Sequence, residues 1–252
     1  MKKFISILLF IFGIVTLSNA YDFNSKSIIY NTEYCYLTDD YAPWKSNSIQ
    51  TVLKSDQKDT IGIKGESLER YKLKDKRVEL FYSTAFLDDF SWQIDYTFAQ
   101  NGIIVPKDII HNKISYNVKD LFGISYGLKN SKYKNDSKSQ TQDVELEKYY
   151  NSFRFAINRS FTHVKNAGNS TGNSVTAHYF YNDNYTAITL SSAKELEALA
   201  NSSVLVSDVK SISLYGEYAI TNDWGLAYST QYVEQNNLYI KRSISLADIY
   251  KF

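Results

Sequence analysis

The stretch FSWQIDYTF, residues 90–98, decides the fold because apolar and polar side chains alternate along it. Every second position is apolar, namely Phe90, Trp92, Ile94, Tyr96 and Phe98. A helix has a repeat near 3.6 residues and would scatter these side chains, whereas a strand places all five on one face. The stretch is therefore predicted to be a strand with one aromatic face.

The same alternation recurs through the chain and predicts an all-β protein. Tight polar turns separate some of the alternating segments, at 88–89, 119–120, 183–184 and 221–223. Longer polar stretches, expected to be loops, separate others, at 129–143, 166–173 and 191–207. Short turns at one end and longer loops at the other are typical of a transmembrane antiparallel up-and-down β-barrel.

The pattern predicts about fourteen strands. They are expected near residues 27–37, 48–55, 60–71, 76–87, 90–100, 110–118, 121–131, 142–150, 153–165, 173–182, 185–191, 207–220, 224–234 and 238–252. Twelve strands are the alternative, because the first three segments are weakly patterned. An even number keeps both chain ends on the periplasmic side. Ser192 and Glu195 have the spacing of a capping box, which predicts a short helix in the last long loop.

A soluble β-sandwich would also alternate, so the period alone does not separate it from a membrane barrel. Three features favour the barrel. The polar face carries Ser, Thr, Gln and Asn with few lysines, the strands are long enough to cross a bilayer at a tilt, and the chain ends on an apolar strand closing at Phe252. The aromatic face is therefore expected to meet outer-membrane lipid.

The first twenty residues, MKKFISILLFIFGIVTLSNA, have the features of a secretory signal peptide cut after Ala20. The other interpretation is an uncleaved anchor, but the apolar run from Phe4 to Val15 is shorter than a spanning helix needs. Residues 1–20 are thus expected to be the signal and 21–252 a single barrel domain, exported to the bacterial outer membrane and folded there by the barrel assembly machinery.

Charge and cysteine content exclude several classes of function. Without Lys2 and Lys3, the 28 basic residues fall to 26 against 27 acidic ones, a balance that argues against nucleic acid as a partner. The single cysteine, Cys35, has no second thiol for an internal disulfide. The 22 tyrosines suit a surface that lies between hydrocarbon and water.

Three C-terminal stretches resemble the YaiO family of outer-membrane β-barrel proteins. They are HYFYNDNYTAITLSSAKELEA, SDVKSISLYGEYAITNDWGLAYSTQY and VEQNNLYIKRSISLADIYKF. The best-matching positions are Glu234, Gln235, Leu238, Tyr239 and Arg242. The chain departs from the family pattern at His178, Lys194 and Lys210, where arginine is usual, and at Asp248, where glycine is common. The resemblance implies the fold and the outer-membrane location, and it implies a setting similar to polysaccharide export.

Asp248 is an exception to the barrel pattern, because the alternation places its carboxylate on the lipid-facing side of the last strand. A β-bulge or a position at the periplasmic rim would reconcile a carboxylate with that face.

Two groups of residues are candidates for function. By parity Glu79, Asp95, Arg154 and Glu217 point into the lumen, where they either set selectivity or pair with one another to neutralise the interior. Glu234, Gln235, Tyr239 and Arg242 lie at the outer end of the last hairpin. The first interpretation is a structural clamp, an ion pair between Arg242 and Glu234 across the hairpin, and the more specific hypothesis is that these residues contact a glycan.

The sequence gives little support for an enzymatic function. His111, His163 and His178 are isolated, and none has a metal-ligand spacing. No catalytic residue, metal or cofactor is therefore predicted, and His163, near the outer end of its strand, is the histidine to test for a barrel hydrolase at the rim.

The leading functional hypothesis is a pore or export channel for a hydrophilic molecule, with polysaccharide or a small solute as cargo. The alternatives are a surface scaffold or adhesin that transports nothing and, third, the rim hydrolase.

Overall fold

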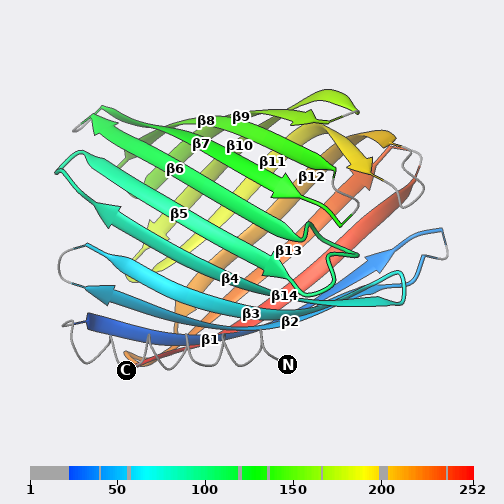
Figure 1. Cartoon of the computed structure of the whole chain (residues 1–252). Helices are drawn as coiled ribbons and strands as arrows, with labels where there is room; N and C mark the ends of the chain where they lie inside the picture. Colours follow the sequence, from blue (N-terminus) through cyan, green and yellow to red (C-terminus); the bar gives the residue numbers. More distant parts are fainter. Residues whose placement is uncertain are drawn as a thin grey trace.

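In a computed structural model the chain forms one closed antiparallel barrel, in which each strand pairs with its sequence neighbours and β1 pairs with β14 (Figure 1). The structure describes residues 23–39, 41–55, 58–118, 121–134, 137–165, 167–198, 204–236 and 238–252. The strands are β1 (Phe23–Leu37), β2 (Trp44–Ser55), β3 (Thr60–Arg70), β4 (Leu73–Ala85), β5 (Phe90–Ala99), β6 (Asp108–Val118), β7 (Phe122–Lys132), β8 (Lys138–Tyr150), β9 (Phe153–Val164), β10 (Gly168–Tyr181), β11 (Asn184–Ala198), β12 (Val204–Ala219), β13 (Trp224–Gln235) and β14 (Tyr239–Lys251). Fourteen strands, not twelve, are confirmed. The expected signal peptide, residues 1–20, and the expected turn at 119–120 lie outside the described residues.

The wall has an apolar outer face, as the alternation predicts. Tyr96 in β5 is 38% exposed and Trp224 in β13 is 49% exposed, although both are large aromatic residues. All strands in the described part of the chain belong to a single closed sheet, in which no second sheet covers these side chains, and a sandwich is excluded. An exposed apolar band of this kind is stable where hydrocarbon replaces water as the surrounding solvent.

Aromatic side chains cluster near the end of the barrel where β1 begins and β14 stops. Figure 1 shows this end of the strands on the left. Phe90 packs on Tyr116 with ring centroids 4.5 Å apart, and Trp224 packs on Tyr250 at 4.8 Å. Each pair joins the first residue of one strand to a residue near the end of its neighbour. Rings at this position form the interfacial girdle that holds a barrel at the depth of the lipid headgroups.

The long loops expected from the sequence are much shorter in the structure. Most of the polar stretches at 129–143, 166–173 and 191–207 belongs to β7, β8, β10, β11 and β12, because Ser, Thr, Asn and Gln suit a strand whose two faces are both wet. The expected helix after Ser192 is wrong for the described residues, since Lys194 pairs with Asp208 and Ala198 pairs with Val204. Within the described part of the chain, no helix is long and apolar enough to cross a bilayer.

One connection at the end opposite the termini folds inward. Residues 100–107, between β5 and β6, bring Val105 against Leu68 of β3 and Ala99 of β5, and these three side chains form a small buried cluster. The carboxylate of Asp75, on β4, holds this connection. Asp75 is 1% exposed and accepts hydrogen bonds from the N–H groups of Asn101 at 3.1 Å and Ile103 at 2.9 Å.

Asp248 faces outward without a β-bulge. Its register partners are Tyr30 on β1 and Leu226 on β13, and the pairing continues without a shift on both sides. β14 stops shortly afterwards, at Lys251. Of the two explanations offered by the sequence, the position near the rim at the end of the strand is the one that fits this carboxylate.

Candidate functional site

The lumen has two chemically different walls. The inward positions of β10–β14 carry mainly small uncharged side chains, including Ser174, Thr176, Thr189, Ser191, Ser211, Ser213, Ser229, Gln231, Ser243 and Ser245. The inward positions of β3–β9 carry most of the charge, at Lys64, Glu66, Arg77, Glu79, Asp95, His111, Lys113, Lys129, Asp143, Glu145, Glu147 and Arg154. Because side chains alternate across each strand, both sets face the interior while the apolar band faces out.

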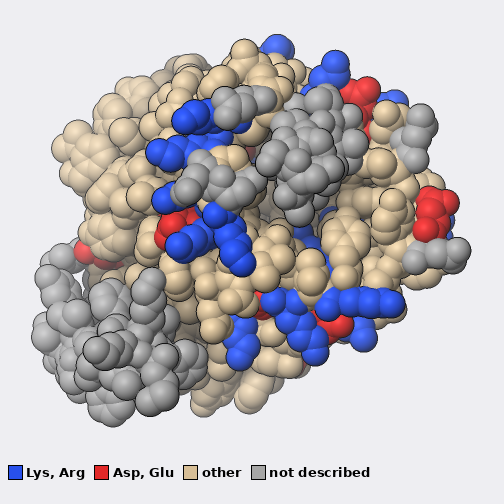
Figure 2. All heavy atoms as spheres, turned by 45° about the vertical axis from the view of Figure 1, so that its right-hand side comes forward, with Lys and Arg blue, Asp and Glu red and all other residues tan. Residues whose placement is uncertain are grey.

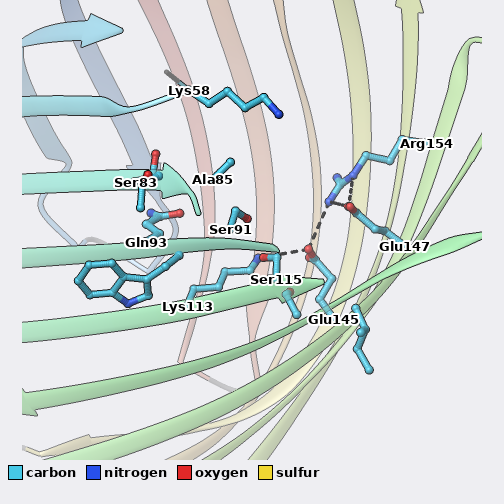
Figure 3. Close-up of a pocket in the computed structure, with 14 residues that line it drawn as sticks. Lys58, Ser83, Ala85, Ser91, Gln93, Lys113, Ser115, Glu145, Glu147 and Arg154 are labelled. Atoms are coloured by element: carbon cyan, nitrogen blue, oxygen red, sulfur yellow. Dashed lines mark hydrogen bonds and ion pairs between the residues drawn. The ribbon is translucent and has the colours of Figure 1, made fainter. Parts of the chain in front are cut away.

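The charged wall is organised into ion pairs that run from strand to strand. Arg77 on β4 pairs with Glu66 on β3. Further along, Lys113 Nζ lies 3.3 Å from Glu145 Oε1, and Arg154 Nη2 lies 3.2 Å from the same carboxylate and also pairs with Glu147 (Figure 3). Arg154 therefore bridges two carboxylates of β8, whose side chains are about one-fifth exposed. Partial burial makes such a network electrostatically stronger than the same pairs on an open surface.

This network forms one side of a cavity of about 340 Å³. Lys113, Glu145, Glu147 and Arg154 line one part, and Ser83, Ser91 and Gln93 line another. Lys58, which precedes β3, points into the cavity from the side opposite Arg154 (Figure 3). The lining combines hydroxyl, amide and both signs of charge, a set of groups that solvates a polar solute or bound water rather than an apolar ligand.

An aromatic patch adjoins the network where β8–β12 approach the end with the termini. His178 Nε2 contacts Arg154 Nη1 at 2.9 Å and stacks on Phe180 with centroids 5.8 Å apart. Tyr215 meets the His178 ring edge-on at 5.8 Å. Tyr149 stacks on Phe180 at 6.4 Å, so the patch extends from β8 to β12. Aromatic faces beside an arginine present both an apolar surface and a charge to a passing molecule.

The structure places the four predicted lumen residues on the inner face, with different partners. Asp95 accepts hydrogen bonds from Gln93 Nε2 at 2.9 and 3.0 Å and lies 3.2 Å from His111 Nδ1. Glu217 lies 3.7 Å from Lys251 Nζ. Glu79 has Lys64 and Thr97 as register neighbours, and among the described residues it makes no ion pair. Their role in selectivity stays a prediction.

The four predicted rim residues divide between the two faces. Glu234 and Arg242 face outward, and no ion pair joins them within the described residues, so the structure does not contain the expected clamp. Gln235 faces inward and donates a hydrogen bond to Ser207 Oγ at 3.0 Å. Tyr239 also faces inward and is 8% exposed. It lies against Tyr41 with ring centroids 5.5 Å apart.

Two histidines that look isolated in the sequence have partners in the structure. His111 Nδ1 lies 3.2 Å from Asp95 and its Nε2 lies 3.9 Å from Asp143, while His178 joins the Arg154 network. His163 faces outward, with Asn169 Oδ1 2.8 Å from its Nδ1. Over the described ranges, no group of histidine, cysteine and acidic side chains has the arrangement of a metal site.

Sequence reasoning missed Glu145 and Glu147, although a signal exists. In DVELE, residues 143–147, acidic and aliphatic side chains alternate, which places three carboxylates on one face of a strand. The partners on β6 and β9 follow only from the register, in which Glu145 lies beside Asn158 and Ser125.

A closed antiparallel sheet with an apolar exterior and a polar interior defines an outer-membrane β-barrel, similar in fold to porins and channels. A model of the YaiO membrane beta barrel domain matches residues 25–195, and the chain belongs to this family. The matched range includes His178 and Lys194, whereas Glu234, Gln235, Tyr239 and Arg242 lie beyond it. The barrel therefore resides in the bacterial outer membrane, with lipid around its outer face.

Solved structures with the same fold have very different sequences. The chain is similar to the CymD monoaromatic hydrocarbon channel, with a TM-score of 0.58, 9% identity, and coverage of 94% of this chain and 90% of that one. It is also similar to a bacterial polysaccharide outer membrane secretin, with a TM-score of 0.58, 6% identity, and coverage of 90% and 98%. Salmonella typhi OmpF in complex with daunomycin gives a TM-score of 0.51 at 12% identity over 90% and 97%. No curated protein sequence matches the chain.

Proposed function

We propose that the barrel is a water-filled passage for hydrophilic molecules across the outer membrane, and that it performs no catalysis. The observation that carries the proposal is the division of the lumen into a wall of paired charges and a wall of small hydroxyl side chains. An interior that served only as a packed core would use large apolar side chains instead, as in small filled barrels. Fourteen strands are also closer to the sixteen of aqueous porins than to the eight of filled barrels.

The connections at the end opposite the termini support an open lumen. β3 and β4 are joined through Tyr71 and Lys72 alone, and a short connection joins Gln235, the last residue of β13, to Tyr239, the first residue of β14. The inward-folding connection, residues 100–107, packs against Leu68 on the wall and is held there by Asp75. Connections this short, or this close to the wall, leave the centre of a wide barrel clear.

Charges of both signs in the lumen favour a passage with weak ionic selectivity. A polysaccharide or a small polar solute is the cargo that such a lining suits, and the resemblance in fold to a polysaccharide secretin adds no more than the shape of the barrel. The mature chain, residues 21–252, is proposed to be a single domain that reaches the membrane through signal cleavage and barrel assembly.

Conductance across planar lipid bilayers tests the passage. Folded wild-type protein is expected to give stepwise current in potassium chloride. Ser213→Trp places an indole on the small-residue wall and is expected to reduce the unit conductance. Leu214→Trp is the matched control, because the next residue faces lipid and is 41% exposed. Folded barrels that carry no current would refute the passage and favour the surface scaffold.

A further inference from the structure

Four aromatic rings form a closed group at the end of the barrel opposite the termini. Tyr41 and Trp44 each contact both Tyr71 and Tyr239, with ring centroids between 5.4 and 6.1 Å apart. The rings come from β2, β14 and the connections that follow β1 and β3, so the group lies where the barrel closes on itself. We define this group as the mouth cluster.

Two cations approach the mouth cluster, one from β3 and one from β14. Arg70 Cζ lies 4.6 Å and Lys241 Nζ 5.5 Å from the centroid of the Trp44 ring. Within the described residues neither cation forms an ion pair with a carboxylate. Glu33, which faces inward on β1, instead accepts hydrogen bonds from Cys35 Sγ and Ser46 Oγ, each at 3.4 Å. The two positive charges therefore remain available to an anion.

The backbone is strained at the connection that carries Tyr71 of the mouth cluster. Tyr71 and Lys72 form the whole connection between β3 and β4, with φ of 52° and 63°. A two-residue hairpin of this kind prefers Asn-Gly, because only small or special residues adopt positive φ without strain. Strain of this sort concentrates at functional positions.

The mouth cluster combines the two features that recognise an acidic sugar. Tyr41 and Tyr71 are 40% and 38% exposed, so part of each ring remains open to solvent and can pack on the apolar face of a pyranose. Arg70 and Lys241 supply charge for a carboxylate, phosphate or sulfate. Trp44 Nε1 is buried without a hydrogen-bond partner among the described residues, which leaves a donor for a sugar oxygen that reaches it. Figure 2 shows that lysine and arginine side chains gather around this end of the molecule.

We propose that the mouth cluster is a binding site for a soluble acidic saccharide. The site does not depend on passage through the lumen, because its residues belong to the rim of the barrel. Trp44, Arg70, Tyr239 and Lys241 occupy inward parity, which directs the site toward the mouth rather than toward lipid.

Binding of oligogalacturonate, a carboxylated sugar oligomer, to the refolded full-length barrel in detergent micelles tests the site by isothermal titration. We expect binding that weakens as salt rises, and a loss of at least tenfold in the double variant Arg70→Gln, Lys241→Gln. Neutral maltohexaose is expected to bind more weakly than oligogalacturonate to the wild type. Lys45→Gln is the matched control, since Lys45 lies 5.8 Å from the Tyr34 ring in a similar contact on the outer face. Its affinity should equal that of the wild type.

Three results would overturn the inference: equal affinity for the charged and neutral sugars, unchanged affinity in the double variant, or competition by vesicles of a phosphorylated lipid but not by a free acidic sugar. The last result would assign the cations to a lipid headgroup. Conductance measured without saccharide separates this inference from the proposed passage. Current without sugar binding would refute the binding site but not the passage. Sugar binding without current would refute the passage but not the binding site.

Discussion

Replacing Asp75 by alanine is expected to release residues 100–107 from the barrel wall while the barrel itself stays folded. The carboxylate is 1% exposed and accepts three hydrogen bonds from the connection, from Asn101 N–H at 3.1 Å, Ile103 N–H at 2.9 Å and Ile104 N–H at 3.5 Å. A fourth bond, from Lys76 N–H at 2.9 Å, lies within β4. The carboxylate is thus the polar anchor for the middle of this segment.

The magnitude follows from the two shorter bonds that cross to the connection, those of Asn101 and Ile103. A hydrogen bond to a charged group contributes about 1.5–3 kcal/mol. The freed N–H groups lie near the barrel end, where water replaces part of the loss, so we expect the free energy of local opening to fall by about 2–4 kcal/mol. Since about 1.4 kcal/mol corresponds to a factor of ten, the population of the open segment rises by roughly 30- to 700-fold.

Amide hydrogen exchange of the barrel in micelles measures this opening. Exchange at Asn101 and Ile103 should accelerate by about two orders of magnitude in Asp75→Ala, and by less in Asp75→Asn, which keeps one acceptor oxygen. Amides in β12 and β13 should be unaffected. The matched control is Asp88→Ala, which removes an exposed carboxylate from the turn at the other end. Unchanged exchange at both amides would show that the apolar contact with Leu68 and the backbone bonds at the two ends of the segment hold it without the carboxylate.

Three further variants test the wall and the lumen. Ile157→Lys places a charge on the lipid-facing side, at a position 58% exposed, and should lower the free energy of unfolding in vesicles by about 2–4 kcal/mol. Asn158→Lys, one residue away and beside Glu145 in the register, should not lower it. Equal losses in the two variants would contradict an apolar outer face and a polar inner face. Arg154→Met should cost about 1–3 kcal/mol in a urea titration, because Glu147 loses its ion-pair partner and Glu145 keeps only Lys113. Adding Glu147→Gln should recover part of that loss, and a neutral effect of Arg154→Met would show the pairs to be solvent-screened. Gly62→Ala places a Cβ 2.0 Å from Phe81 Cζ and should destabilise the barrel by about 1–3 kcal/mol. The double variant Gly62→Ala, Phe81→Leu should recover part of this stability. If it does not, the loss comes from the backbone and not from the clash with the ring.

Alternation was sufficient to predict the wall of the barrel. Hydrocarbon and water impose opposite demands on the two faces of each strand, so a period of two persists wherever the strand crosses the bilayer. The strands predicted at residues 90–100 and 224–234 therefore agree with β5 and β13 to within one residue at each end. A soluble sandwich was also compatible with that period, and the polar character of the inward face separated the two.

The ends of the strands were not predictable by the same reasoning. Beyond the bilayer both faces of a strand meet water, and the alternation that marks a strand disappears. The stretch at 166–173 reads as a loop for this reason, although Gly168–Gly172 pair with Ser160–Val164. At Ser192 and Glu195 the local capping signal competed with the ladder of hydrogen bonds to β12, and the ladder prevailed because it satisfies a longer run of backbone groups.

The position of Asp75 shows what a single strand cannot reveal. In KDK, residues 74–76, an aspartate reads as a solvated residue near a turn, and no local pattern marks it as buried. Its burial depends on the connection after β5, more than twenty residues further along the chain, whose N–H groups donate to the carboxylate. Asp75 and the connection are both visible in the sequence, but only the fold shows that they lie in contact.

The lumen shows the same limit with a functional consequence. Parity assigns Asp95, Glu145 and Arg154 to the interior, but the pairing that decides the field inside the barrel depends on the register of five strands, β5 to β9. Pairs such as Lys113 with Glu145 cancel much of the charge along one wall, so a solute beside that wall meets oriented hydrogen-bonding groups rather than a strong net potential. Paired charges of this kind are the reason why we propose a hydrophilic cargo for the barrel instead of ionic selectivity.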